Sequence, residues 1–368
     1  MDHKKIRAIG ALILVVIWAV LTGFSWFGPE TAISESERRE LAKMPEINVN
    51  TILNGKFMSE FEDYTLDQFP LRDTFRQVKS LFHFYVMRQG DNNDIYIADG
   101  FAAKQEYPMS QISVDYALGK FRKFYEKYLE GTGSRVFMTV VPDKGYYMAE
   151  ESGHLAMDYE AMFDAFREGM PYATYIDLTD TLETEDYYRT DTHWRQEKLI
   201  ETAERICQVM GVTAPKASDF TEIALERPFY GVYYGQAALP MEPETIYYLQ
   251  SDLLKACKVF NYESNGYGEV YDMTKLSSRD LYDVFLSGAR SLLTIENPNA
   301  ATDKELIVVR DSFGSSIVPL LVQDYAKVTL VDIRYIQMDM LERFIEIGGQ
   351  DVLFLYSTLV LNNSSTIK

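Results

Sequence analysis

From about residue 96 onward, the chain alternates short apolar runs with segments whose apolar residues recur at helical spacing. Five apolar runs predict buried strands, at 135–141, 173–178, 305–309, 327–331 and 351–356. Between them lie helical stretches at 158–168, 195–210, 315–325 and 337–347. Strands that alternate with helices are typical of a doubly wound, mostly parallel sheet. The predicted fold class is therefore α/β, with active groups at the carboxyl ends of the strands.

The stretch at about 213–300 fits this alternation poorly, because it is rich in Tyr, Gly and Pro. We expect it to be an insertion that walls a cleft in an α/β domain spanning 96–368. The region 29–95 precedes that domain and is predicted to be helical. Its "SERRELAKMPEIN" predicts a juxtamembrane helix that ends at Pro45, and apolar positions on both sides of Pro70 predict an amphipathic helix pair.

The N-terminus has the pattern of a membrane anchor. Lys4, Lys5 and Arg7 precede twenty uncharged residues at 8–27, a helix long enough for the roughly 30 Å core of a bilayer. The basic residues before this run and the acidic "ETAISESE" after it predict a cytoplasmic stub and an extracytoplasmic domain. We expect residues 1–28 to hold the protein in the cell membrane by a single pass. A cleaved signal peptide is the alternative, disfavoured by the length of the run and by the lack of a clear small-x-small cleavage site.

Composition narrows the classes of partner. The formal charge of −19 opposes binding to nucleic acid, which needs a basic face. Cys207 and Cys257 can pair in an oxidising compartment, but Cys207 falls on the apolar stripe of the helix predicted over 195–210. Two buried thiols are therefore favoured. No Cys or His cluster has metal-ligand spacing, so we expect neither a metal nor another cofactor.

The block "RDSFGSS" carries the best candidate nucleophile. It follows the strand predicted over 305–309 and precedes an apolar helix, which places Ser312 at a strand-to-helix turn where Gly314 allows a tight backbone. The backbone N–H groups at the start of that helix can stabilise an oxyanion. The alternative is that Ser312 or Ser315 only caps the helix.

The block "RTDTHWRQE" carries the best candidate base. Of the four histidines, His193 is the best placed to take a proton from Ser312, and Asp191 can accept the Nδ1–H of its imidazole. A polar turn before the helix at 195–210 is the alternative. Tyr188, immediately before this block, is a weaker candidate for a substrate or oxyanion contact.

A third patch, "VVPDKGYYM", lies where the strand at 135–141 ends. Lys144 and Tyr147 can line a pocket there, and structural turn chemistry accounts for the same residues equally well. Together with Gly314 and Tyr188, they complete the set of weaker candidates.

In this order the motifs resemble the DHHW protein family and the alginate O-acetylation proteins of the AlgX/AlgJ type, both of which are SGNH-hydrolase-like. The resemblance covers most of the chain and is most specific in "TDTHW" and "RDSF". Asp-x-His precedes Ser, the reverse of the order in ordinary SGNH esterases. Thr192 stands where the DHHW motif has His, and Arg310 stands where the SGNH block has Gly.

The resemblance implies a triad of Ser312, His193 and Asp191 that carries an acyl group and passes it to a sugar hydroxyl. The implied acceptor is a polysaccharide, and the implied acyl donor is a membrane-bound O-acyltransferase partner. The leading hypothesis is thus a membrane-anchored, extracytoplasmic O-acetyltransferase. Two alternatives stay open: a carbohydrate esterase of the same fold, and a non-catalytic glycan-binding or assembly factor.

Overall fold

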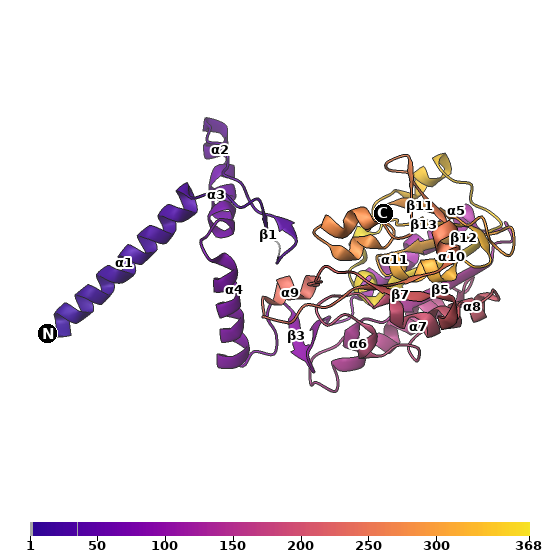
Figure 1. The fold of residues 1–368 in the computed structure, drawn as a ribbon, viewed down its shortest axis with the longest axis horizontal. Coiled ribbons are helices and arrows are strands. Elements are labelled where there is room, and N and C mark those ends of the chain that lie inside the picture. The colour runs from indigo at the N-terminus through magenta and orange to yellow at the C-terminus, as the bar shows by residue number, and fades with distance from the viewer. Residues whose placement is uncertain (1–2, 35) are drawn as a thin grey trace. The chain divides into compact units, whose positions relative to one another are not determined.

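Residues 3–34 and 36–368 are described by the computed structural model (Figure 1). The first two residues of the expected cytoplasmic stub, and Glu35 of the expected juxtamembrane region, lie outside the described residues. The chain divides into two compact units. The second unit comprises Asn93–Tyr233 and Met241–Lys368. The first unit comprises the residues before Asn93 and the short segment between the two parts of the second.

The first unit is largely helical. Its helices are α1 (His3–Phe27), α2 (Val49–Leu53), α3 (Lys56–Asp67) and α4 (Arg72–Leu81), and α4 continues into a π-helical turn at Phe82–Val86. Strands β1 (Ile33–Ser34) and β2 (Arg39–Glu40) pair antiparallel. The two helices predicted on either side of Pro70 are present as α3 and α4. Among the described residues, α1 is the one helix long and apolar enough to cross a membrane, and a signal sequence has the same character.

The helix predicted over "SERRELAKMPEIN" is wrong. Arg38 has a φ of 54°, in the left-handed region that a right-handed helix excludes, and Arg39 lies in β2. The Arg39 guanidinium donates to both carboxylate oxygens of Asp67 on α3, at 2.8 and 2.6 Å. The N–H of Ala42 donates to the same carboxylate at 2.9 Å. These contacts hold the segment extended along α3, and local helix propensity is too weak to oppose them.

The second unit, in its described residues, is organised by an eight-stranded sheet of order β10-β9-β11-β13-β12-β14-β5-β6. The strands from β13 to β6 in this order are parallel, and β10, β9 and β11 pair antiparallel with their neighbours. The parallel strands are β5 (Val136–Val141), β6 (Thr174–Tyr175), β12 (Lys304–Arg310), β13 (Tyr325–Val331) and β14 (Asp351–Ser357). All five predicted strands are present, and the one expected over 173–178 is reduced to two residues. The prediction of a mostly parallel α/β sheet is confirmed.

The stretch expected to be an insertion, 213–300, supplies the antiparallel end of this sheet. It contributes β9 (Lys258–Asn261), β10 (Gly266–Gly268) and β11 (Leu292–Glu296), and also a separate ribbon of β7 (Thr221–Ala224) and β8 (Tyr247–Gln250). Its short helices are α9 (Val232–Ala237) and α10 (Asp252–Ala256). The apolar pattern does not reveal β9 and β10, because their partly exposed residues interrupt a continuous apolar run, whereas β11 is buried from Leu292 to Ile295.

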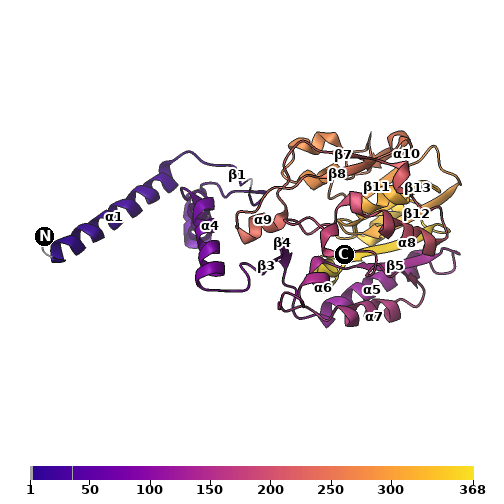
Figure 2. The ribbon, with the colours of Figure 1, turned by 60° about the horizontal axis from the view of Figure 1, so that its bottom comes forward.

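Helices cover the sheet on both sides. α5 (Gln111–Tyr128) and α7 (Tyr159–Gly169) lie side by side and pack in one apolar cluster with Val309 of β12 (Figure 2). α8 (Ile200–Met210) packs in another cluster with Val308. Successive side chains of a strand point to opposite faces, so β12 is buried on both sides.

Two predicted helices are shorter than expected. The one expected over 315–325 consists of α11 (Gly314–Ile317) and a 3-10 turn at Val318–Leu321, whose proline lacks the backbone donor that a continuing α-helix needs. The one expected over 337–347 is a 3-10 helix at Met338–Arg343. The remaining elements of the second unit are β3 (Ile95–Ala98), β4 (Phe101–Lys104), α6 (Lys144–Met148) and α12 (Thr358–Asn362).

The central strands give a direct test of this core. Leu353 of β14 is fully buried. We expect Leu353→Ala to lower the free energy of unfolding by about 2–5 kcal/mol, since it removes apolar atoms and leaves a cavity. Denaturant titration measures the change, and Leu155→Ala, at an exposed leucine, should change it by less than about 0.5 kcal/mol. Equal effects of the two variants would contradict the assigned burial.

Candidate active site

Ser312 lies directly after β12, in a turn that is fixed from the neighbouring strand. One carboxylate oxygen of Asp311 accepts a hydrogen bond from the Phe313 N–H at 2.9 Å. The other accepts from the N–H and the hydroxyl of Ser357, at the end of β14, both at 2.7 Å. Because β12 and β14 are parallel neighbours, their carboxyl ends meet at one edge of the sheet. Asp311 thus pins the serine turn at the edge where the strand rule places functional groups.

His193 is presented by a loop that closes on itself just before α8. The N–H of Tyr188 donates to the carbonyl of His193 at 3.1 Å, and Tyr187 pairs with Trp194 in an isolated β-bridge. The Trp194 indole N–H then reaches the serine turn, where it donates to the Ser316 hydroxyl at 2.8 Å. Trp194 therefore joins the two blocks.

Asp191, His193 and Ser312 form one chain of hydrogen bonds. Asp191 Oδ1 lies 2.6 Å from His193 Nδ1, and His193 Nε2 lies 2.8 Å from Ser312 Oγ. A carboxylate only accepts, so the Nδ1–H donates to Asp191 and leaves Nε2 free to accept the Ser312 proton. The second oxygen of Asp191 accepts from the Val232 N–H at 2.8 Å. The structure therefore brings together the three residues selected from the sequence, and their catalytic role remains a prediction.

The imidazole of His193 is held flat by an aromatic ring. Tyr282, in a 3-10 helix at Leu281–Val284, stacks on it with ring centres 4.0 Å apart and planes 11° apart. The Tyr282 hydroxyl donates to Ser316 at 2.8 Å, the same hydroxyl that accepts from Trp194. Sequence reasoning missed Tyr282, because it lies in a tyrosine-rich stretch where no local signal separates it from the others.

Gly231 allows its backbone segment to approach the backbone of Thr190 and Asp191 closely. A Cβ on Gly231 would lie 2.2 Å from the Thr190 carbonyl oxygen and 2.4 Å from the Asp191 Cα. The Gly231 N–H donates to the Thr190 hydroxyl at 2.9 Å, and the next residue supplies the Val232 N–H that binds Asp191. Sequence reasoning missed Gly231, which lies in the irregular Tyr- and Gly-rich stretch 213–300.

The weaker candidates lie near the site but have structural partners. Lys144 is buried, and its Nζ donates to the carbonyl of Tyr188 at 2.7 Å, which braces the loop that carries His193. The Tyr147 hydroxyl donates to the Thr179 carbonyl at 3.2 Å. The Tyr188 hydroxyl is buried, without a hydrogen-bond partner among the described residues.

The absence of a side chain at Gly314 matters for close packing more than for a special backbone angle. A Cβ there would lie 2.9–3.1 Å from the side-chain carbons of Arg310, which is fully buried. The Arg310 guanidinium donates to the carbonyl of Asp311 and the hydroxyl of Ser315, both at 3.1 Å. Burial lowers the pKa of Arg310, and the Asp332 carboxylate 4.0 Å away opposes that change. The arginine that departs from the Gly of the SGNH block thus supports the serine turn from beneath.

The oxyanion site expected at the start of the helix is largely occupied. The N–H of Phe313 is bound by the Asp311 carboxylate, that of Gly314 by the Asp311 carbonyl, and that of Ser315 by the Ser312 carbonyl. Within residues 3–34 and 36–368, no hydrogen bond is found for the N–H of Ser312 itself. That N–H is the donor left to face a developing oxyanion.

Two polar residues at or after the end of β14 are also engaged. Ser357 is bound to Asp311, and the side chain of Asn362 contacts Glu106, the carbonyl of Pro108 and the N–H of Ser110. Neither residue therefore supplies a side-chain donor to an oxyanion in this conformation.

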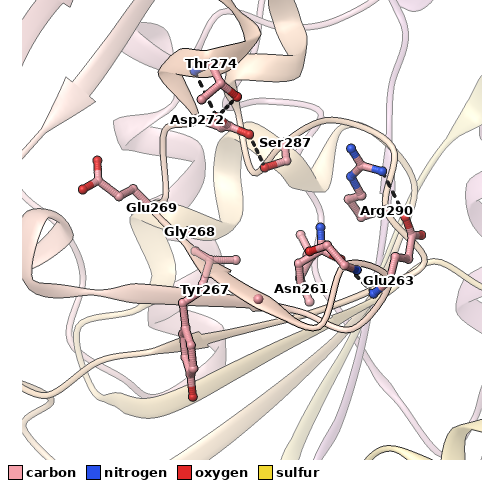
Figure 3. Close-up of a pocket in the computed structure, with 13 residues that line it drawn as sticks. Asn261, Glu263, Tyr267, Gly268, Glu269, Asp272, Thr274, Ser287 and Arg290 are labelled. Carbon is pink, nitrogen blue, oxygen red and sulfur yellow. Dashed lines mark hydrogen bonds and ion pairs between the residues drawn. The ribbon is translucent and has the colours of Figure 1, made fainter.

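An open cavity of about 510 Å³ lies at the same edge of the sheet (Figure 3). Val309 of β12 pairs with Val331 of β13, and Val331 pairs with Leu292 of β11. β11 in turn pairs with β9, so that Asn261, the last residue of β9, also lies at this edge. Three strand spacings separate β12 from β9, roughly 14 Å. The polar residues among those that line the cavity are Asn261, Glu263, Ser264, Glu269, Asp272, Thr274, Ser287 and Arg290.

One segment connects the cavity with His193. Asp272 and Ser287 line the cavity and are hydrogen-bonded to each other at 2.7 Å (Figure 3). Tyr282 lies between them in sequence. Arg290 donates to Glu263 at 3.0 Å across the same cavity, and its Nε is buried without a partner among the described residues. A ligand in this cavity would therefore lie beside the segment that orients His193.

Metal and thiol chemistry find no support in the described residues. No group of three or more His, Cys, Asp or Glu side chains in 3–34 and 36–368 is arranged to hold a metal ion. Cys207 and Cys257 are buried and unbonded to each other, and burial raises the pKa of their thiols to about 12 and about 11. Both thiols are therefore unreactive at neutral pH.

The fold and this edge of the sheet define an α/β protein with a serine–histidine–aspartate cluster. Residues 170–331 match the family model described as DHHW protein, which confirms the resemblance carried by the motifs. None of the curated proteins matches the sequence.

Solved structures are similar to this chain at low sequence identity, and the first two below share its fold. A DHHW family protein from Eubacterium siraeum is 21% identical, with a TM-score of 0.61 over 75% of this chain and 95% of that one. PatB1 of Bacillus cereus, solved with a sulfonyl adduct, is 16% identical, with a TM-score of 0.58 over 73% and 94%. The O-acetyltransferase domain of AlgJ from Pseudomonas putida is 14% identical, with a TM-score of 0.44 over 73% and 92%.

The buried amine of Lys144 predicts a pH dependence of stability. Burial lowers the pKa of Lys144 to about 7, although the carboxylates of Asp191, Glu244 and Asp143 favour its charge. In the unfolded chain the amine keeps its ordinary pKa near 10.4, so between pH 7 and 10 the unfolded state binds more protons. Folding stability should therefore rise with pH in this window, by up to about 1.4 kcal/mol per unit from this group.

Lys144→Met should remove that rise, and the exposed Lys255→Met should retain it. Urea titrations at pH 7, 8 and 9 measure the slopes. Parallel slopes for the parent and Lys144→Met would contradict a depressed pKa for Lys144.

Proposed function

We propose that the chain transfers an acetyl group onto a cell-surface or secreted polysaccharide. The observation that carries the proposal is the hydrogen-bonded chain of Asp191, His193 and Ser312 at the carboxyl edge of the sheet. The match of residues 170–331 to the DHHW family model supports the proposal, because the matched range contains all three residues. A mostly parallel α/β fold whose loops gather at one edge is a suitable frame for such a site.

In the proposed reaction, His193 Nε2 takes the proton of Ser312 as Oγ attacks the carbonyl of the acyl donor. The Oγ–carbonyl bond forms, and the leaving group departs with the proton from His193. Asp191 stabilises the imidazolium in both half-reactions and keeps the tautomer correct. The sugar hydroxyl then gives its proton to His193 and attacks the acyl-serine. The acyl–Oγ bond breaks, and His193 returns the proton to Ser312 Oγ.

The cavity of Figure 3 is the proposed place for the acceptor glycan. Its volume lies within the usual range of about 300–1,000 Å³ for ligand sites. Carboxylate, amide and hydroxyl groups line it, and they can exchange hydrogen bonds with sugar hydroxyls. Glu269 and Asp272 add negative charge beyond the Glu263–Arg290 pair, which favours a neutral or amino sugar over a uronic acid.

The membrane assignment is part of the same proposal. In this proposal α1 spans the membrane, with the basic Lys4, Lys5 and Arg7 inside and the second unit outside the cytoplasm. A membrane-bound O-acyltransferase partner is proposed as the source of the acetyl group, because an extracytoplasmic site needs a donor that delivers acetyl across the bilayer. The resemblance stated from the motifs supports this partner.

The nucleophile assignment is tested with a fluorophosphonate probe and an aryl acetate. We expect the probe to label Ser312, as mapped by peptide mass spectrometry. Ser312→Ala should lower turnover of 4-nitrophenyl acetate by on the order of 10⁴-fold, because both half-reactions pass through its oxygen. Ser277→Ala, at an exposed serine, is the matched control.

Labelling at another serine would overturn this assignment. If the glycan of the source organism is acetylated normally in cells with Ser312→Ala but not in cells that lack the protein, the non-catalytic alternative is favoured. A purified chain that hydrolyses the aryl acetate and never transfers acetyl to the isolated glycan favours the esterase.

The acceptor cavity is tested by separating transfer from hydrolysis. We expect Arg290→Gln to raise the KM for the isolated glycan several-fold, because it removes a guanidinium from the cavity wall. Hydrolysis of 4-nitrophenyl acetate without glycan should be unchanged, since it needs only the serine chain. Arg343→Gln, outside the cavity, serves as the control, and equal KM values in the two variants would exclude this cavity as the acceptor site.

A further inference from the structure

The helix α4 faces its own unit with polar side chains. Arg76 donates through Nη2 to the carbonyl of Gly235 at 2.5 Å. Ser80, fully buried, donates to the carbonyl of Ala237 at 2.6 Å. Both acceptors belong to the segment 234–240 of the same unit. One side of α4 is thus fastened by hydrogen bonds to backbone carbonyls, with little apolar packing.

The opposite side of α4 is apolar and largely exposed, and within its unit Phe75 contacts Phe69, with ring centres 5.5 Å apart. We define the outer stripe as Leu71, Phe75, Val78, Phe82 and Tyr85, which recur at steps of four, three, four and three residues. Each is between 49% and 73% exposed. A helix at the surface of a soluble protein has the reverse arrangement, with its apolar stripe toward the core. An exposed stripe of this length marks an interaction surface.

The charges beside the stripe suit an anionic surface. The stretch 71–88 carries four basic residues, Arg72, Arg76, Lys79 and Arg88, and one acidic residue, Asp73. Arg72 and Arg76 pair with Glu37, at 2.6 and 3.2 Å, and Lys79 and Arg88 are the basic side chains of this stretch for which no ion pair is found among the described residues. A basic helix with aromatic and aliphatic residues along one face is the pattern of helices that lie in the plane of a membrane interface.

The stripe is continuous with the candidate membrane helix. Trp26 of α1 contacts Phe61 of α3, with ring centres 5.6 Å apart. Trp18, in the middle of α1, contacts Phe69, with ring centres 6.1 Å apart. Phe69 lies two residues before Leu71, where the outer stripe begins. A bilayer that contains α1 therefore reaches the start of the stripe.

We propose that the outer stripe inserts into the interfacial region of an anionic lipid bilayer. Phe75, Val78 and Phe82 bury in the boundary between headgroups and acyl chains, and Lys79 and Arg88 contact lipid phosphates. The inference shares with the proposed function only the placement of α1 in a membrane. The inserted stripe adds a second contact with the membrane. A single spanning helix leaves the first unit free to rotate, and the second contact restrains it at the membrane surface.

The test uses the full chain reconstituted in vesicles of phosphatidylcholine and phosphatidylglycerol. One added cysteine at a time carries an NBD fluorophore: Val78→Cys in the stripe, Leu14→Cys in α1, or Lys255→Cys at an exposed site of the second unit. Cys207 and Cys257 are buried thiols, and the labelled parent chain gives their background.

We expect the Val78 label to shift to the blue and to be quenched by lipids brominated near the headgroup. The Leu14 label should be quenched by lipids brominated deeper in the chain, and the Lys255 label should stay in water. A Val78 label in water beside a quenched Leu14 label overturns the proposal and points to a protein that covers the stripe. A quenched Val78 label with Leu14 in water supports the stripe but contradicts the proposed anchor.

A charge variant separates specific insertion from nonspecific adhesion of the label. Phe82→Asp, at a half-exposed position, should reduce quenching of the Val78 label, because a carboxylate is costly in the interface. Gln77→Glu adds the same charge to the same helix away from the stripe and should retain the quenching. Equal quenching in both variants would overturn the proposal.

Discussion

The hydrogen bond from the Trp194 indole to the Ser316 hydroxyl sets the geometry on which the site depends. His193 and Ser312 are 119 residues apart in sequence, and a proton transfer between them needs a separation near 3 Å. Trp194 directly follows His193, and Ser316 lies one helical turn after Ser312. A bond between these two neighbours therefore fixes the spacing of the reacting pair. Gln196 adds a second tie, since its amide donates to the Ser316 carbonyl at 2.7 Å.

The stretch expected to be an insertion is part of this arrangement. The Gln196 side-chain oxygen accepts from the Leu249 N–H at 2.8 Å and from the Tyr271 hydroxyl at 3.0 Å. Tyr282 stacks on His193, and Gly231 admits the backbone that supplies a donor to Asp191. The residues between 213 and 300 thus build the walls and supports of the site in addition to extending the sheet. Their glycines and tyrosines look irregular in sequence because their roles depend on segments far away in the chain.

The N-terminal region shows how a tertiary contact overrides a local pattern. "SERRELAKMPEIN" has helical composition, yet the ion pair of Arg39 with Asp67 keeps it extended. The same region contains a helix whose apolar side is turned outward. Both features suit a segment whose stability comes from partners that a soluble globule lacks, such as a lipid surface. In water, an exposed stripe of Phe, Val and Leu is unfavourable, and burial of each side chain contributes about 1.5–3 kcal/mol.

The sequence by itself determined the parallel strands and the two polar blocks. Buried parallel strands such as 351–356 are continuous apolar runs, and a serine after such a run must lie at the carboxyl edge of the sheet. The sequence also selected Asp191, His193 and Ser312, because few residues of those types follow strands or begin helices. Only the tertiary structure decided that the three meet, that Trp194 and Tyr282 hold them, and that the N–H groups after Ser312 are occupied. The meeting of His193 with Ser312 and the bond of Trp194 to Ser316 join segments more than a hundred residues apart, and a local pattern carries no information about such distances.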